Sequence, residues 1–217
     1  MTKQIQLKIA GFHEMYGSIP SGNIILLIGD PGSGNDIFAL QTLHLHALEG
    51  EEVVYLTTDR HPKDIIEEMY AYGWDIKRIE SLWKFIDTYT ELDVEKHIQE
   101  VIEEIDKGRW SCIDSITTLW MKSKRQDIIT LMRKMRNKAR EKEGLHFLVA
   151  IKGIIDKRDE QILKHIVDGI LEFEPQTGGN RGTIKITKMR RRAGTWMNIP
   201  YRITLRGIEI ETAMRII

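Results

Sequence analysis

The sequence predicts an α/β protein in which helices cover both faces of a mainly parallel central sheet, a three-layer αβα sandwich with an antiparallel β-meander at its C-terminal end. Two observations carry this prediction. Short apolar runs alternate with helical patterns between residues 23 and 173, and strands separated by helices form crossover units with parallel strands. Residues 183–188 and 201–205 instead alternate in polarity, as antiparallel strands with one solvated face do.

Six short runs rich in β-branched and apolar residues are the predicted strands of the parallel sheet. They lie at residues 23–28, 52–58, 84–89, 110–115, 145–151 and 167–173. Apolar residues at helical spacing predict helices between these runs, beginning near residues 37, 62, 94 and 127. Gly73 is the predicted end of the second helix.

The composition favours one domain in a reducing compartment. The 217 residues are 41% hydrophobic, enough for one sizeable core, so we expect a single domain over residues 1–217. Lys and Arg balance Asp and Glu at 32 each, so no overall charge attracts nucleic acid or membranes. A single Cys112, no signal peptide and no long apolar run predict a cytoplasmic protein without membrane contact. The charged fraction of 29% is typical of thermophile proteins, which favour ion-pair networks.

A glycine-rich loop follows the first predicted strand. It reads Gly29-Asp30-Pro31-Gly32-Ser33-Gly34-Asn35-Asp36, which keeps the G-x-x-x-x-G frame of a P-loop. In a P-loop, backbone N–H groups and the next helix N-terminus cradle phosphates. The candidate nucleotide-binding residues are Gly29, Pro31, Gly32, Ser33, Gly34, Asn35 and Asp36.

Asn35 and Asp36 stand where a P-loop has Lys and then Ser or Thr. Two unit charges about 4 Å apart interact by roughly 4 kcal/mol at an effective dielectric near 20, so loss of the lysine weakens nucleotide binding by on the order of a thousandfold. Asp36 adds a carboxylate that repels phosphate, although its hard oxygens also make it a candidate Mg²⁺ ligand. The sequence therefore predicts weak binding of ATP or ADP with Mg²⁺, or none, and no other cofactor.

Six landmarks, in order along the chain, resemble the RecA superfamily and most closely its KaiC-like members. They are residues 11–23, 55–62, 73–75, 113–119, 167–170 and 188–190. The resemblance covers nearly the whole chain. It implies a RecA-like fold and a site related to that of P-loop ATPases.

The resemblance also assigns roles to single residues. In the family an acidic pair after the second strand polarises the attacking water, and the matching positions here are Asp59 and Arg60. Asp59 is thus the candidate catalytic base, one methylene shorter than Glu, while Arg60 places a cation where an acid is expected. Asp114 matches the Walker B acid and is, with Asp36, the candidate metal ligand. Lys152, where the family senses the γ-phosphate, is a candidate source of the missing positive charge.

Lys188 and Arg190 are similar to a pair that reaches the phosphates of a neighbouring subunit in the family. This implies a homo-oligomer, or assembly with a paralogous RecA-like subunit. The alternative is that both are edge-strand charges that discourage aggregation.

Three basic clusters, at residues 122–125, 133–142 and 190–192, are candidate DNA contacts, as in recombinase relatives. The alternative is that they are solvated helix faces, because acids interrupt the second cluster and no aromatic residues alternate with the charges. His44 and His46 are two residues apart on a predicted helix and cannot share a metal ion. Cys112 is predicted to be a buried small hydrophobe rather than a nucleophile.

Departures at Asn35, Asp36 and Arg60 favour a non-hydrolysing regulatory or scaffold subunit that acts through self-association or through a paralogue. One alternative is a slow ATPase in which residues 32–34 bind phosphates, Asp36 and Asp114 hold Mg²⁺, and Asp59 is the base. Another is an accessory protein of the recombinase-paralogue type in DNA repair.

Overall fold

One nine-stranded sheet runs through the described part of the chain, which in this computed structural model comprises residues 2–177, 179–194 and 196–212. Its strands are β3 (Asn23–Gly29), β4 (Val53–Thr57), β5 (Trp83–Asp87), β6 (Trp110–Asp114), β7 (Leu145–Ile151), β8 (Gly169–Pro175), β9 (Arg181–Met189), β10 (Met197–Thr204) and β11 (Gly207–Ile210). Their order across the sheet is β11-β10-β9-β8-β3-β7-β6-β4-β5. From β8 to β5 all neighbours are parallel, whereas β8 to β11 pair antiparallel.

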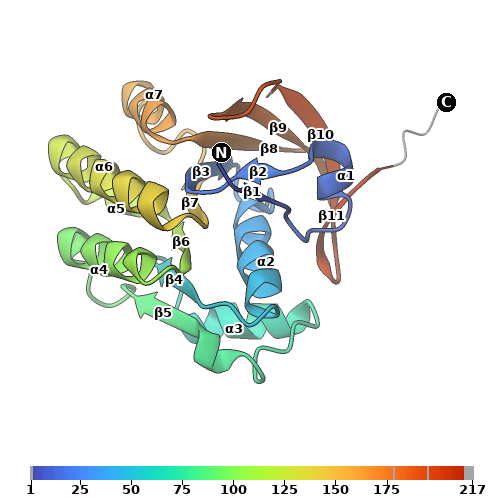
Figure 1. Cartoon of the computed structure of the whole chain (residues 1–217), viewed down its shortest axis with the longest axis horizontal. Helices are drawn as coiled ribbons and strands as arrows, with labels where there is room; N and C mark the ends of the chain where they lie inside the picture. The colour runs from blue at the N-terminus through green and yellow to red at the C-terminus, as the bar shows by residue number, and fades with distance from the viewer. Residues whose placement is uncertain (1, 178, 195, 213–217) are drawn as a thin grey trace.

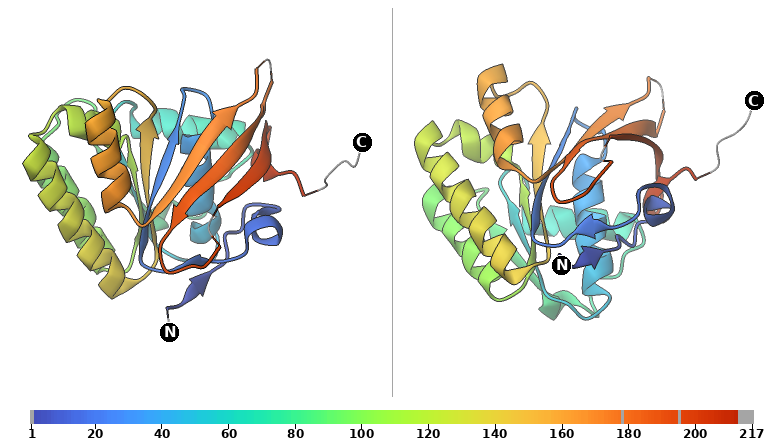
Figure 2. Two further views of the ribbon diagram at one scale, coloured as in Figure 1. Left: turned by 90° about the horizontal axis from the view of Figure 1, so that it is seen from above. Right: turned by 45° about the horizontal axis from the view of Figure 1, so that its top comes forward.

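Helices cover both faces of this sheet (Figure 1). They are α1 (Phe12–Tyr16), α2 (Asn35–Ala47), α3 (Pro62–Ala71), α4 (Val94–Asp106), α5 (Ile116–Met121), α6 (Arg125–Lys142) and α7 (Lys157–Ile166). A short 3-10 turn, Glu80–Leu82, precedes β5, and a two-stranded arm pairs β1 (Gln4–Ile5) with β2 (Ile19–Pro20). Figure 2 shows the green α4 and yellow-green α6 on one face and the blue α2 on the other.

Two apolar cores hold the three layers together. One core joins α1, α2 and α3 to the sheet and contains the fully buried Phe12, Phe38 and Phe147. The other joins α4 to α7 to the opposite face and includes Ile102 and Met135. Side chains of successive strand residues point to opposite faces, so strands buried on both sides read as continuous apolar runs.

The predicted three-layer fold, with its mainly parallel sheet and its C-terminal meander, is confirmed. The parallel strands lie within a few residues of the predicted positions, and β11 adds a third strand to the meander. The sequence did not indicate the arm, α1, α5 or α7. In α7 the sequence is mostly charged, and only Leu163 and Ile166 bury apolar side chains, so its apolar stripe was too thin to recognise.

The carboxyl ends of β3, β4, β6 and β7 meet at the same edge because these strands are parallel neighbours. In open α/β sheets ligands bind outside this edge. The loops that follow these four strands therefore lie together, and they hold most of the predicted site residues.

Within the described residues, no helix is both long and apolar enough to cross a lipid bilayer.

Candidate functional site

A cavity of about 250 Å³ opens at this edge of the sheet. Its lining includes seven of the predicted site residues, which are Gly29, Pro31, Gly32, Asn35, Asp36, Asp59 and Asp114. Arg60 lines it as well. Ser33 and Gly34 do not line the cavity, and Ser33 is fully buried. The structure thus gathers the predicted phosphate loop, the candidate base and the candidate metal ligands around one space.

Two residues of the glycine loop have the left-handed backbone conformation that favours glycine. Gly32 and Gly34 have φ of 80° and 84°, and no heavy atom lies within 4 Å of the position that a Cβ on Gly32 would take. A Cβ on Gly34 would instead approach Ile203 and Ile208 of the meander to 3.0 and 2.9 Å. Position 34 therefore favours glycine for two reasons: the backbone has a left-handed conformation, and a side chain would collide with the meander.

Asn35, at the position of the P-loop lysine, points into the protein. Its side-chain amide donates to the carbonyl oxygens of Leu27 at 3.2 Å and of Ala150 at 3.0 Å. The Ser33 hydroxyl donates to its side-chain oxygen at 3.2 Å, and the residue is 6% exposed. Asn35 therefore ties the start of α2 to β3 and β7, and its polar atoms are used within the protein.

The candidate base, Asp59, is surrounded by hydroxyl groups. Thr58 Oγ1 donates to Asp59 Oδ2 at 2.8 Å, and Ser115 Oγ donates to the same oxygen at 3.1 Å. Thr118 Oγ1 lies 3.1 Å from both carboxylate oxygens. A general base must accept a proton from a water within hydrogen-bond reach, and here three protein hydroxyls compete for the same lone pairs.

Asp114, at the end of β6, sits in a largely buried position. The Tyr55 hydroxyl donates to its Oδ2 at 2.7 Å, and Arg60 Nη2 lies 3.1 Å from the same oxygen. Burial raises the pKa of the Asp114 carboxyl, and Arg60 and the Tyr55 hydrogen bond oppose that rise. The sequence analysis missed Tyr55, because within an apolar strand its ring reads as core and nothing local reveals where its hydroxyl points.

Arg60 bridges three acidic side chains from three elements. Its Nη1 lies 2.6 Å from Glu68 Oε2 on α3, and its Nη2 lies 3.6 Å from Asp36 Oδ2 on α2 as well as 3.1 Å from Asp114. Burial disfavours the charged guanidinium, but the negative groups around it outweigh this effect and raise the pKa of Arg60. Glu68 was also missed, since on the sequence it is one of several acids on a charged helix.

The side chains present do not fit a Mg²⁺ ion. Magnesium needs oxygen ligands free to point at it in near-octahedral geometry, whereas the guanidinium of Arg60 already contacts both predicted ligands, Asp36 and Asp114. Among the residues that the structure describes, no group of three or more His, Cys, Asp or Glu side chains is arranged to hold a metal ion.

Lys152 is exposed and does not line the cavity. Its backbone N–H donates to the Gly29 carbonyl at 2.9 Å, which joins the end of β7 to the start of the loop. The cation that the structure does bring into the cavity is Arg60.

Lys188 and Arg190 lie at the C-terminal end of α7. Lys188 Nζ donates to the carbonyl oxygens of Lys164 at 2.7 Å and of His165 at 3.0 Å, and Arg190 Nη2 donates to that of His165 at 3.1 Å. Cations at this end of a helix satisfy free carbonyls and favour the negative pole of its dipole. Burial lowers the pKa of Lys188 to about 8.

Two members of the third basic cluster bind the N-terminal segment of the chain. Arg191 donates to the Ser21 carbonyl at 2.6 Å and to Asn23 Oδ1 at 2.5 Å. Arg192 donates to the Ser18 carbonyl at 3.0 Å and stacks 3.7 Å from the centre of the Tyr16 ring. Because Arg191 and Arg192 are engaged in these intramolecular contacts, they are less available to contact DNA phosphates.

Several cations of the second basic cluster form ion pairs within the protein. Arg136 and Arg140 of α6 contact Asp168 Oδ1 at 2.8 and 3.2 Å, and Asp168 is fully buried. Lys138 and Lys142 each lie 3.2 Å from Asp106 Oδ1 on α4. The family landmark at residues 167–170 thus has a structural role that the sequence did not reveal.

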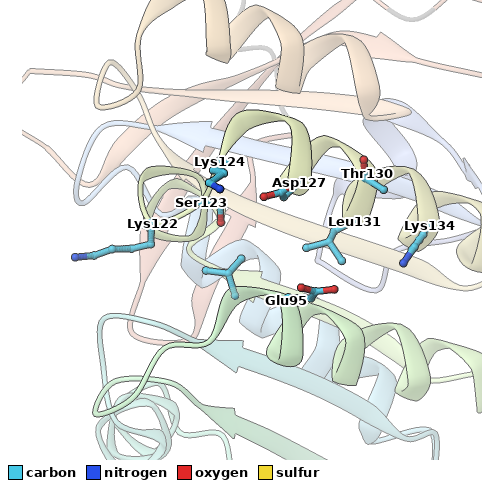
Figure 3. A pocket seen from close by; sticks show the side chains of 9 residues that line it. Glu95, Lys122, Ser123, Lys124, Asp127, Thr130, Leu131 and Lys134 are labelled. Carbon is cyan, nitrogen blue, oxygen red and sulfur yellow. The ribbon is translucent and has the colours of Figure 1, made fainter.

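The first basic cluster borders a separate cavity of about 380 Å³ between α4 and α6. In Figure 3 Glu95 of α4 lies across from Leu131 and Lys134 of α6, with Lys124 and Asp127 at the start of α6. Arg125 is turned away to Asp159, which it contacts at 2.5 Å. Because acids alternate with lysines in this lining, the cavity is not a uniformly basic groove, and DNA binding stays a prediction.

The remaining candidates are structural, as expected. His44 stacks on Trp74 and His46 on Trp110, with ring centres 5.3 and 3.7 Å apart. Burial raises the pKa of Cys112 well above its usual value, which keeps this thiol protonated and unreactive.

Comparison with known proteins shows which family the chain matches. The family described as "ATPase: KaiC" matches residues 5–215. The chain is similar to a UPF0273 protein of Pyrococcus horikoshii, 27% identical over 96% of this chain and 94% of that one. A UPF0273 protein of Thermotoga maritima is 25% identical over 97% and 96%. The crystal structure of a KaiC-like protein from Pyrococcus horikoshii superposes with a TM-score of 0.80 at 22% identity, covering 97% of this chain and 100% of that one.

The match to the solved structure shows the fold, and the match to the family model shows the protein family. The RecA-like P-loop fold is thus shared with KaiC-like proteins. This chain belongs to the KaiC family of ATPases.

Proposed function

We propose that this KaiC-family protein does not hydrolyse ATP and acts as a regulatory or scaffold subunit, through self-association or through assembly with a catalytically complete paralogue. The observation that carries the proposal is the direction of the Asn35 side chain. Its amide donates to Leu27 and Ala150 inside the sheet, so the position that supplies a phosphate-binding ammonium in a P-loop supplies a structural hydrogen bond here.

The charge of the cavity supports the same conclusion. Asp30, Asp36, Asp59 and Asp114 line it with Arg60 as the only Lys or Arg side chain among its described lining residues. A triphosphate brings several more negative charges to this space. Since one lost lysine weakens binding by on the order of a thousandfold, tight ATP binding is not expected.

Water activation is also disfavoured. Three hydroxyls, from Thr58, Ser115 and Thr118, engage the Asp59 carboxylate. A water would have to displace at least one of them before Asp59 acted as base. Arg60, the next residue, is fixed to carboxylates and does not replace the second acid of the family pattern.

The test is titration calorimetry with ATP·Mg²⁺ at high micromolar concentration, combined with a phosphate-release assay. We expect wild type to show neither heat nor turnover, and Asn35→Lys/Asp36→Thr to bind ATP because it regains the cation and the hydroxyl. Asn35→Lys alone separates the two contributions. Micromolar binding by wild type would contradict the charge argument, and phosphate release abolished by Asp59→Asn would establish the slow ATPase instead.

Two further hypotheses need their own tests. If Lys152 supplies the missing charge, Lys152→Ala should abolish any nucleotide binding that wild type shows. If the protein is a DNA-repair accessory, DNA should be retained at low salt and lost steeply as salt rises. Lys124 and Lys134, which border the cavity of Figure 3, are the residues to substitute in that assay.

A further inference from the structure

Arg60 is placed where three elements of the fold meet. It follows β4 and precedes α3, and its guanidinium reaches Asp36 at the start of α2, Glu68 on α3 and Asp114 at the end of β6. A single nitrogen, Nη2, contacts both Asp36 Oδ2 and Asp114 Oδ2. These are the two carboxylates that sequence analysis assigns to a metal ion.

The loop around Arg60 is held so that this contact persists. Thr57 Oγ1 donates to the Arg60 carbonyl at 2.7 Å. The Thr58 N–H donates to the Asp114 carbonyl at 2.7 Å, and the Ser115 N–H donates to Thr58 Oγ1 at 2.9 Å. Hydrogen bonds therefore join the backbone next to Arg60 to the backbone next to Asp114. The Arg60 side chain is about one third exposed.

The acids around Arg60 need a cation. Asp114 is 13% exposed at its side chain and Glu68 is 28% exposed, and carboxylates gathered with little solvent repel one another unless a positive charge lies between them. Arginine suits this task because its planar fork presents donors to several carboxylates at once and keeps its charge under all ordinary conditions.

We propose that Arg60 is a resident cation that takes the place of a divalent metal ion between Asp36 and Asp114, so that this site is held together by the protein alone and excludes Mg²⁺. The inference concerns the same cavity as the proposed function but does not depend on it. A protein that bound a nucleotide without metal would still satisfy it.

A consequence follows for variants that lack the guanidinium. Arg60→Gln removes the nitrogen, Nη2, that lies 3.6 Å from Asp36 Oδ2 and 3.1 Å from Asp114 Oδ2. Two carboxylates that face one vacated cation position supply the oxygen ligands that hard divalent cations prefer, with water completing the coordination. The substitution should therefore create a divalent-cation site that wild type does not have.

The experiment measures Mn²⁺ binding by electron paramagnetic resonance, and thermal unfolding in EDTA and in Mn²⁺, on the full chain. We expect wild type to bind no Mn²⁺ at this site and to unfold at the same temperature in both conditions. Arg60→Gln should bind Mn²⁺ at concentrations at least tenfold below those at which wild type shows no binding, and it should unfold several degrees lower in EDTA, with recovery in Mn²⁺. Arg60→Lys, which keeps a positive charge, should stay insensitive to Mn²⁺.

Arg133→Gln is the matched control, because Arg133 is an exposed arginine on α6 far along the chain from the site, and it should behave as wild type. Should Arg60→Gln fail to fold, Arg60→Gln/Glu68→Gln lowers the repulsion and keeps Asp36 and Asp114 for the same titration. Mn²⁺ binding by wild type that Asp114→Asn abolishes would overturn the inference. A folded Arg60→Gln variant without Mn²⁺ binding would overturn it as well.

The two proposals fail differently. Phosphate release from ATP by wild type in EDTA, abolished by Asp59→Asn, would contradict the proposed function and leave the role of Arg60 intact. Binding of Mn²⁺ by wild type through Asp114, without ATP binding, would contradict the role of Arg60 and leave the proposed function intact.

Discussion

The side-chain amide of Asn35 donates a hydrogen bond to the carbonyl oxygen of Ala150 at 3.0 Å, across 115 residues of chain. This contact fixes the first turn of α2 against β7 from the position at which a P-loop ATPase carries its lysine. Asn35 is thus a structural link between two layers.

Removing that link should destabilise the fold. Asn35→Ala leaves buried carbonyl oxygens of Leu27 and Ala150 without the amide donor, and such a loss costs about 1–3 kcal/mol. The free energy of unfolding from urea denaturation measures the effect. Asn198→Ala, at an exposed position on β10, should change it by less than ~0.5 kcal/mol, and equal effects of the two substitutions would show that the Asn35 contacts contribute nothing.

The buried Asp168 should be among the most sensitive positions in the chain. Asp168→Asn removes the charge that Arg136 contacts at 2.8 Å in an environment without solvent exposure. Breaking a buried pair from one side costs roughly 3–5 kcal/mol. We expect a loss of this size in urea denaturation.

Asp106→Asn is the matched control for that measurement. Asp106 also contacts two cations of α6, Lys138 and Lys142, but its side chain is 51% exposed. Solvent and salt screen exposed pairs, so this substitution should cost much less than Asp168→Asn. If both substitutions cost the same, burial is not what makes the Asp168 contact important.

Acid should destabilise the protein through its buried histidines. Burial lowers the pKa of His146 to about 4 from an ordinary value of 6.5, because the enclosed ring takes up a charge less readily; the hydrogen bond from Nε2–H to the Glu143 carbonyl opposes this shift. The unfolded chain takes up the proton more readily, so stability falls as pH drops from about 6.5 towards 4 and is unaffected above about pH 7.5. At pH 5 the loss from this group is roughly 2 kcal/mol.

The check is urea denaturation at pH 7 and pH 5. His146→Gln should lose roughly 2 kcal/mol less than wild type between the two pH values, because glutamine does not titrate. His13→Gln, at an exposed position on α1, should lose as much as wild type. A His146 variant with the full wild-type loss would assign the acid sensitivity to other groups.

The role of Lys188 and Arg190 in a neighbouring subunit is a proposal that light scattering can test. If the pair acts across an interface, Lys188→Ala/Arg190→Ala should lower the molar mass of the assembled protein. Both side chains also donate to carbonyls of α7, so a loss of about 0.5–2 kcal/mol in unfolding free energy is expected in either case. Unchanged mass with lower stability would leave only the intramolecular role.

The strands, the main helices and the phosphate loop were predictable because each has a local signature. Buried parallel strands are continuous apolar runs, and α4 places apolar residues at helical spacing. Glycines at 32 and 34 mark left-handed turns that few other residues adopt. Such signals depend on neighbours within about one helical turn, so the sequence carries them without knowledge of the fold.

The sequence also predicted which residues lie close together, because parallel strands bring their carboxyl ends to one edge. That rule predicts that the loop at 29–36, Asp59 and Asp114 meet, and all three line one cavity. It does not predict what each side chain does there. Asp59 is engaged by hydroxyls from residues 58, 115 and 118, of which two are more than fifty residues away.

What the sequence alone determined is therefore the family, the layers and the identity of the residues at the edge of the sheet. Tertiary structure alone decided that Asn35 turns inward, that Arg60 lies between Asp36 and Asp114, and that Arg136 serves the buried Asp168. The physical reason is that hydrogen bonds and ion pairs are short-ranged and directional, while the residues that make them are distant along the chain. The sequence shows that Arg60 and Arg136 carry positive charges, but only the fold shows which carboxylates lie beside them.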